Sequence, residues 1–306
     1  MKKTINGIST VIAPLTNLEW ADLRGADLAG ANLAGAYLGY ACLNDANLSR
    51  AILTGAFLMN TELVNTNLDN SELTRAMLSE ANLSQAELPC ANLKAANLRK
   101  AILIETSLVN TELASANLIN ADLRQADLTK ATLSNADLTG GDLEKAVLIS
   151  AVMKGANLRQ ANLSYANLSC ADLRQADLTK AILNESILTG ISLARAYLTT
   201  AVLNKSDLSQ QANLSQAELS QAELIGANLG RADLSEANLT EATLSQAELI
   251  GTNLNEADLT QVNLSGANLT QANLNKAKYG NTKYNNSIIF PKGFCAEDHN
   301  GLERVD

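Results

Sequence analysis

The residue types that carry out most enzymatic chemistry are rare in this chain. It has one histidine, His299, in a polar stretch close to the C-terminus. Nucleophilic triads and most metal centres need histidine as a base or a ligand, and the sequence contains neither a P-loop nor a GxGxxG motif. Carboxylates recur throughout, so no single pair stands out as a general acid and base. We therefore expect no catalytic residues, no metal site and no cofactor, and hence no enzyme.

The cysteines and the N-terminus indicate where the chain resides. The four cysteines, at positions 42, 90, 170 and 295, show no CxxC or zinc-finger spacing, which is typical of reduced intracellular thiols. The segment after Met1, from Thr4 to Ile12, is too polar for a signal peptide. No apolar run approaches the ~18 residues of a transmembrane helix. We expect a cytoplasmic protein that does not bind membrane.

The charge of the chain is negative and unevenly spread. The net charge is −9, and residues 211–274 hold eight acids and one base, Arg231. A negative surface is repelled by phosphates and by anionic lipid headgroups. We therefore expect no direct nucleic acid binding and no membrane partner.

A five-residue repeat must position every side chain. Its register runs from Leu18 to Leu208 and resumes, after one inserted residue at Gln211, from Leu214 to Leu274. Leucine occupies 51 of the 52 block centres, with one methionine, and alanine stands two places earlier in 40 of 52. A period of five fits neither a helix, with 3.6 residues a turn, nor an alternating strand.

Period five predicts short extended segments that turn a corner every five residues. Four segments close a square, so one coil should take about 20 residues, with the leucine and the alanine pointing inward. Glycine at the fifth place, as at Gly25 and Gly30, favours corners that need a positive φ. We expect an all-β solenoid of about 13 coils with capped ends, because the ends of a stacked array expose apolar surface and unpaired backbone. The insertion at Gln211 should form a small outward bulge.

Blocks such as Ala21-Asp-Leu-Arg-Gly25 and Ala46-Asn-Leu-Ser-Arg50 resemble the pentapeptide-repeat proteins, whose consensus is Ala-(Asp/Asn)-Leu-x-x. The resemblance covers about residues 16–289, and the tail from Ser287 to Phe294 is similar to the ending of cyanobacterial members. It implies a right-handed quadrilateral β-helix.

The repeat register also predicts how the chain is divided. Residues 1–15 lie outside it and should form an N-terminal cap that Pro14 ends; their apolar spacing is roughly helical, but Gly7 and a β-branched run weaken a helix. Residues 16–210 form the first stretch of β-helix, and residues 211–289 continue it after the insertion. Residues 290–306 form a C-terminal cap and tail.

Large apolar residues take outward positions in the first coils, where side chains one coil apart should stack in columns. Two columns are expected, one just before the central leucine and one at the fifth place. Clustered aromatics and methionines are typical of interface cores, although single exposed apolar residues need no explanation and the N-terminal segment could cover them. The candidate partner-binding residues are Trp20, Tyr37, Tyr40, Phe57, Met59 and Met77.

The end of the repeat carries a second apolar group. Tyr279 and Tyr284 replace the central leucine, and Ile289 should take the next interior place. Large rings can close the end of a leucine and alanine tube, or they can meet a second copy of the chain. We therefore expect either a monomer or an end-to-end homodimer. The candidate end-cap or dimer-contact residues are Tyr279, Tyr284, Ile289, Phe290 and Phe294.

Two functions fit these observations. The first is a non-enzymatic scaffold that binds an unidentified protein partner through the N-terminal aromatic residues. The resemblance implies the alternative, because some family members are acidic rods that mimic duplex DNA and bind DNA gyrase or another type II topoisomerase. In residues 211–274 the acids before the central leucine alternate with neutral residues along each column, while Glu236 and Glu256 stack directly. This spacing favours a solvated surface and hence the scaffold.

Overall fold

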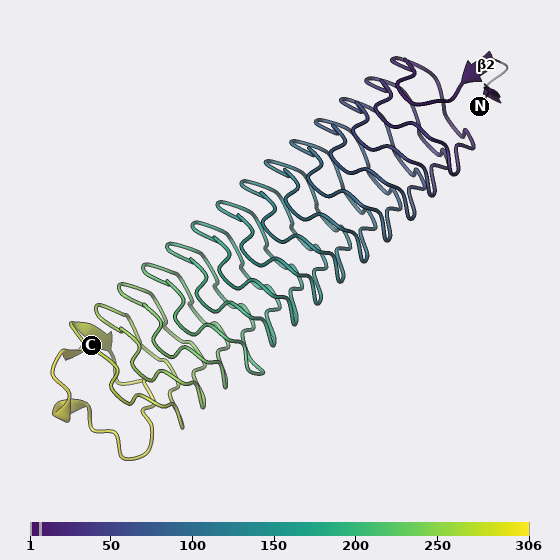
Figure 1. Ribbon diagram of the computed structural model, residues 1–306. Coiled ribbons are helices and arrows are strands. Elements are labelled where there is room, and N and C mark those ends of the chain that lie inside the picture. The colour runs from purple at the N-terminus through teal and green to yellow at the C-terminus, as the bar shows by residue number, and fades with distance from the viewer. Residues whose placement is uncertain (1, 6–7, 306) are drawn as a thin grey trace. The chain divides into compact units, whose positions relative to one another are not determined.

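The computed structural model describes residues 2–5 and 8–305. The chain divides into two compact units, Met1–Val152 and Met153–Asp306, and each is described by itself. Within each unit, Figure 1 shows successive coils of the chain lying beside one another. The few longer elements lie near the chain termini. They are β1 (Lys2–Ile5), β2 (Ile8–Val11), β3 (Thr282–Tyr284), the 3₁₀ helix η1 (Ala296–Asp298) and β4 (Leu302–Arg304).

Each five-residue block ends in a β-turn. In the first block the amide of Ala21 donates to the carbonyl of Leu18 at 3.1 Å, and Trp20, the third residue of this turn, has a φ of 63°. A positive φ at the third residue is what a type II turn requires. The same turn recurs from block to block, which confirms the predicted corner every five residues.

Neighbouring coils are joined by backbone hydrogen bonds. The amide of Leu18 donates to Tyr37 at 2.7 Å, and the amide of Tyr37 donates to Thr16 at 2.9 Å. In unit 1 the parallel bridges join residues four blocks apart, from Asn17 with Tyr37 to Thr132 with Val152. The predicted coil of four blocks is therefore confirmed.

The core of each unit is built almost wholly from the leucine and alanine positions. Leu28 and Leu33 have no exposed surface, and Met153 fits the same interior place. Where threonine replaces the alanine, its hydroxyl donates to a backbone carbonyl, as Thr61 does to Leu38 at 2.9 Å. The interior positions therefore hold few residue types, and most of the sequence variation lies at the outward positions.

The fifth position adopts a positive φ whether or not it holds glycine. Gly25 has a φ of 62°, but Tyr40 and Lys100 have nearly the same value, at 60° and 57°. This conformation is unfavourable for a residue with a Cβ. Where the coils are regular, the amide of such a residue donates to the next coil and so holds this conformation, as Tyr40 does to Met59 at 3.0 Å.

The insertion in unit 2 shifts the register without breaking it. Ile187 still pairs with Asp207 at the regular spacing, whereas Ser192 pairs with Asn213, one residue further on than that spacing. Gln210 and Gln211 both have positive φ, at 59° and 68°, and both are exposed. The extra residue therefore forms an outward bulge, as the sequence predicts.

One expectation about the chain ends needs correction. In residues 1–15, β1 and β2 form an antiparallel pair, in line with the expectation that a helix is disfavoured there; Gly7 lies outside the described residues. Ile289 does not point inward: it bridges Asn268 from an outward position and is 52% exposed. Asn268 and Ile289 are one residue further apart in the sequence than a regular bridged pair such as Asn253 and Asn273. The register therefore shifts by one residue, and Phe290 takes the position in the block that the sequence assigned to Ile289.

Candidate binding surfaces

The outward aromatics of unit 1 stack in two columns, as expected from their spacing. Trp20 and Tyr40 have parallel rings with centroids 4.2 Å apart, and the Tyr37 and Phe57 rings are parallel at 4.9 Å. Parallel bridges continue the second column from Phe57 to Met77. The coil thus brings side chains from distant blocks into direct contact.

These side chains differ in how far they are exposed. Trp20 is 72% exposed, Tyr40 50% and Tyr37 41%, whereas Phe57 and Met59 are half-buried. The exposed rings are held by their stacked neighbours and by the rigid coil below them. We name this surface, made by Trp20, Tyr37, Tyr40, Phe57, Met59 and Met77, the aromatic patch.

A cleft of about 430 Å³ opens within the aromatic patch, and its lining includes Tyr37, Gly39, Tyr40 and Phe57. Gly39 follows the central leucine of its block and is buried. Met59, one coil further on, also lines this cleft. We name this hollow the aromatic cleft.

Two carboxylates line the aromatic cleft. Oε1 of Glu19 lies 3.9 Å from the place where a Cβ on Gly39 would stand, so this carboxylate reaches over the glycine. Glu80 lines the cleft further along and lies 3.7 Å from the ammonium of Lys100. The cleft therefore combines apolar walls with negative charge.

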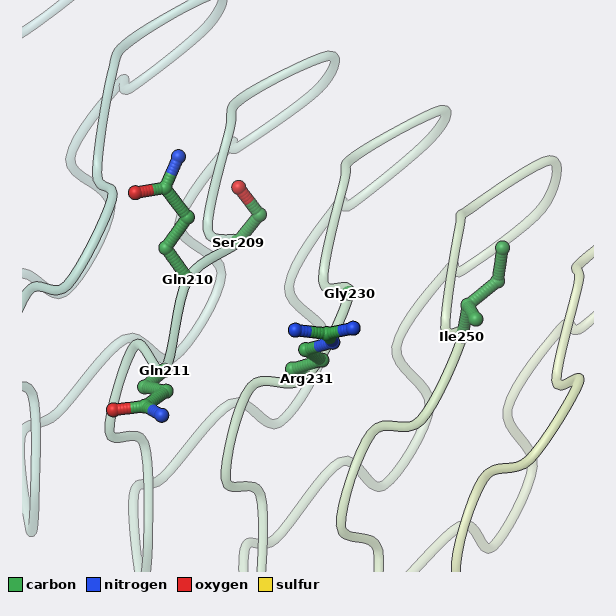
Figure 2. Close-up of a pocket in the computed structure, with 6 residues that line it drawn as sticks. All are labelled: Ser209, Gln210, Gln211, Gly230, Arg231 and Ile250. Atoms are coloured by element: carbon green, nitrogen blue, oxygen red, sulfur yellow. The ribbon is translucent and has the colours of Figure 1, made fainter.

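A second groove, of about 550 Å³, lies at the insertion in unit 2. Figure 2 shows Arg231 and Ile250 on neighbouring coils beside the bulge that carries Gln211. Gly230 has the same place in its block as Gly39. We name this hollow the insertion groove; it is lined by Ser209, Gln210, Gln211, Gly230, Arg231 and Ile250.

The acids of residues 211–274 are bound by side chains of neighbouring coils. Asn238 donates to Glu218 at 2.8 Å, and Gln216 donates to Glu236 at 2.9 Å. Lys276 forms an ion pair with Glu256 at 2.9 Å, and its hydrogen bond and charge lower the pKa of that carboxyl. Each of these carboxylates thus has an amide or ammonium donor on a neighbouring coil, although Glu236 and Glu256 still follow one another directly. The other five, bonded in the same way, are Glu223, Asp233, Glu241, Glu248 and Asp258.

The aromatic residues of the C-terminal tail form one cluster, and it includes His299. The Phe294 ring stacks on His299 at 4.3 Å and on Phe290 at 4.9 Å. Tyr279 packs edge-on against Phe294, and Tyr284 against Phe290. Burial raises the pKa of Tyr279 to about 12.

Some exposed groups received no role from the sequence. Tyr165 and Tyr197 of unit 2 are 51% and 52% exposed, yet neither stacks on another ring within the described residues. His299 joins the tail cluster, although its polar sequence surroundings gave no signal of this contact. Gly39 could have been noticed, because glycine rarely follows the central leucine in this chain.

The part of the chain that the structure describes shows no group of three or more histidine, cysteine or acidic side chains placed to hold a metal ion. All four cysteines are free thiols. No helix among residues 2–5 and 8–305 is long and apolar enough to cross a membrane.

The repeats match a known family. A sequence model described as pentapeptide repeats matches residues 16 to 193 and 210 to 275 in overlapping copies. None of the curated proteins compared with the chain matches it.

Several solved structures are similar to the chain. The protein alr5209 of Nostoc PCC 7120 is 35% identical over 34% of this chain and 84% of its own, with a TM-score of 0.33. HetL of Nostoc sp. strain PCC 7120, involved in heterocyst differentiation regulation, is 30% identical over 86% of this chain and 89% of its own, with a TM-score of 0.23. QnrB1, a plasmid-mediated fluoroquinolone resistance protein, is 16% identical over 65% of this chain and 90% of its own, with a TM-score of 0.37.

The sequence model of pentapeptide repeats covers well over half of the chain. The chain therefore belongs to the pentapeptide-repeat family, which implies a right-handed quadrilateral β-helix.

Proposed function

We propose that the protein is a non-enzymatic scaffold that binds another protein through the aromatic patch. The observation that carries this proposal is the pair of ring stacks, Trp20 on Tyr40 and Tyr37 on Phe57, beside one cleft. Tyrosine and tryptophan dominate the binding energy of many protein interfaces. The patch offers four aromatic rings within three coils.

Rigidity strengthens this proposal. Tyr37 and Phe57 sit on bridged positions of adjacent coils, and their stacking leaves the rings little freedom to lose when a partner binds. Ordering a flexible side chain at an interface costs about 0.5–1.5 kcal/mol of binding free energy. Side chains that are already ordered in the free protein avoid this cost.

The array around the patch has finer features that we also propose. We propose about 13 coils of about 20 residues in a cytoplasmic protein. Residues 1–15 and 290–306 would cap its ends, with 16–210 and 211–289 as the repeat stretches. The tail cluster would then either close the end or contact a second copy. Size-exclusion chromatography with light scattering separates a monomer from an end-to-end homodimer.

A pull-down from native lysate tests the proposed contact surface. The double variant Tyr37→Ser with Phe57→Ser removes one ring stack and should lose the partner that the unchanged protein retains. The control is Tyr165→Ser with Tyr197→Ser, which removes two exposed tyrosines outside the patch and should retain the partner. Equal thermal unfolding of the two variants shows that both remain folded. Retention of every partner by the patch variant would falsify the proposal.

The alternative function is an acidic mimic of DNA that acts on DNA gyrase or another type II topoisomerase. The eight acids and one base of residues 211–274 favour it. Against it stands the bonding of those carboxylates to donors on neighbouring coils, which spaces the charges without a continuous stripe. A supercoiling assay at micromolar protein separates the two, since the scaffold should neither inhibit the topoisomerase nor protect it from drug.

A further inference from the structure

We propose that the aromatic cleft binds one arginine or lysine side chain of a basic segment on the partner protein. This inference rests on the proposed function, because it names the chemistry of the partner at the same patch. Three observations carry it: the glycine at the floor, the carboxylate above that glycine and the apolar walls.

The fold does not require glycine at position 39. Gly39 is not among the residues with positive φ, unlike Gly35 just before it. A Cβ at Gly39 would meet the Met59 carbonyl oxygen at 3.6 Å and Glu19 Oε1 at 3.9 Å, which are ordinary contacts. Alanine would lose less conformational freedom on folding than glycine, so glycine at this position is not favoured by stability. Because glycine has no side chain, the space beside Gly39 stays open and forms part of the cleft.

The Glu19 carboxylate gives that space a negative charge. Its oxygen lies over Gly39, on the floor of the cleft. The backbone amide of Glu19 donates to Asn17, but no hydrogen bond or ion pair engages its carboxylate within the described part of the chain. A carboxylate in this setting is matched by an incoming guanidinium or ammonium group.

The walls fit the stem of a long cationic side chain. Arginine and lysine carry three or four methylene groups before the charge, and these pack well along apolar surface. Met59, Phe57 and the edges of the tyrosines supply such a surface. Glu80 lies along the same cleft, although Lys100 shares its charge. None of the residues that line the cleft is a cation.

The insertion groove shows that this combination is specific to the aromatic cleft. It also has a glycine floor, but Arg231 supplies a positive charge, and the other lining residues are neutral. A cationic side chain would be repelled there. Gly230 therefore provides a matched control position within the same protein.

A short peptide tests the inference on the full-length protein. The probe is the peptide Ac-Gly-Arg-Gly-NH₂, and its control replaces arginine by citrulline, which has the same shape without the charge. Trp20 is the chain's one tryptophan and stacks on Tyr40, so its fluorescence reports on the cleft. We expect the arginine peptide to bind at least about tenfold more tightly than the citrulline peptide, and higher salt to weaken it.

Two variants in the aromatic cleft and one control variant in the insertion groove locate the binding. Glu19→Gln removes the charge and should weaken the arginine peptide about tenfold while leaving the citrulline peptide unchanged. Gly39→Ile fills the floor and should abolish binding of both peptides; Ile104 has the same place in its block, so the coil accommodates this side chain. Gly230→Ile, in the insertion groove, should change neither peptide.

The outcomes distinguish this inference from the function on which it rests. Equal binding of both peptides, or no effect of Glu19→Gln, overturns the cationic ligand even if the pull-down still depends on Tyr37 and Phe57. If peptide binding depends on charge but the Tyr37→Ser with Phe57→Ser variant still retains every partner in the pull-down, the cationic ligand of the cleft is supported and the scaffold proposal is overturned. No detectable binding of the arginine peptide at millimolar concentration also overturns the inference.

Discussion

Two hollows on this protein open at glycines that follow a central leucine, yet their linings differ. The aromatic cleft at Gly39 has stacked rings and two carboxylates, whereas the insertion groove at Gly230 has glutamines, an isoleucine and a guanidinium. The first lies in an unbroken register, and the second lies where the register slips. The outward side chains thus give the two hollows different chemistry, and only the aromatic cleft has the apolar and acidic lining of the proposed cation site.

The two hollows also differ in their backbone bonding. At the aromatic cleft the amide of Tyr40 donates to Met59 across the coils, and the amide of Ala41 closes the turn to Leu38. Among the described backbone hydrogen bonds, the amides of Gln210 and Ala212 make neither of the corresponding bonds. The insertion groove is thus a consequence of a local defect, while the aromatic cleft is built on an intact coil.

Reversal of the charge at Glu19 should change the affinity of the aromatic cleft for the arginine peptide more than removal of that charge does. Glu19→Arg places a cation on the floor of the aromatic cleft and should weaken the arginine peptide about a hundredfold, because attraction is replaced by repulsion. Arg231→Glu, the opposite reversal in the insertion groove, should leave the binding unchanged. Titration of Trp20 fluorescence measures both, and equal effects of the two variants would contradict the difference between the hollows.

Removal of the inserted residue should make the two regions alike. Deletion of Gln211 restores the regular spacing of the coil and allows Gln210 to donate to the carbonyl of Gly230. We expect the free energy of unfolding to rise by about 1–2 kcal/mol, because two backbone hydrogen bonds form again. Chemical denaturation measures it. Deletion of Gln216, which is in register, should destabilise the protein; similar effects of the two deletions would rule out the account of the bulge.

Two buried serines, one in each unit, differ in whether the hydroxyl forms a hydrogen bond, and we expect a smaller effect on stability from their replacement. Ser71 of unit 1 is buried, and its hydroxyl has no hydrogen-bond partner in the described structure. Ser206 of unit 2 donates to the carbonyl of Leu203 at 2.7 Å. Ser71→Ala should stabilise the protein by about 1 kcal/mol, and Ser206→Ala should destabilise it by up to about 1 kcal/mol. Thermal unfolding distinguishes the two, and a loss of stability in Ser71→Ala would contradict the assignment.

The smallest effect concerns the exposed pair of Asp22 and Arg24. The hydrogen bonds of the Arg24 guanidinium, at 2.8 and 2.6 Å, lower the pKa of Asp22 to about 2. Because this pKa lies below the ordinary value, the pair's contribution to stability is complete above pH ~4 and is lost as the pH falls through about 2. An NMR titration of the Asp22 carboxyl measures the pKa; a value that Arg24→Gln leaves unchanged would exclude this cause.

The interior was predictable from the sequence because leucine and alanine each recur at one fixed position of the five-residue block. Leucine and alanine at fixed spacing define the buried pair, and the length of the coil follows from four corners. The spacing also predicts the contact of Tyr37 with Phe57 and of Trp20 with Tyr40, which the parallel rings confirm. Stacking needs only the register, and the register is visible in the sequence.

Features that depend on more than the register were not predictable. The positive φ of Lys100 and Tyr40 is imposed by hydrogen bonds to the next coil, not by their residue types. The slip before Ile289 occurs where the repeat motif has ended, so no pattern marks it. The position of the Glu19 carboxylate over Gly39 depends on a side-chain conformation, which sequence spacing does not determine.

The most direct test is a hydrogen–deuterium exchange footprint of the protein bound to the partner that it captures. We expect slower exchange for amides in residues 37–60, a span that contains Tyr37, Gly39, Tyr40, Phe57 and Met59 of the aromatic cleft, and unchanged exchange in residues 209–231 at the insertion groove. Slower exchange at the insertion groove, with residues 37–60 unchanged, would contradict the claim that the protein binds its partner through the aromatic patch.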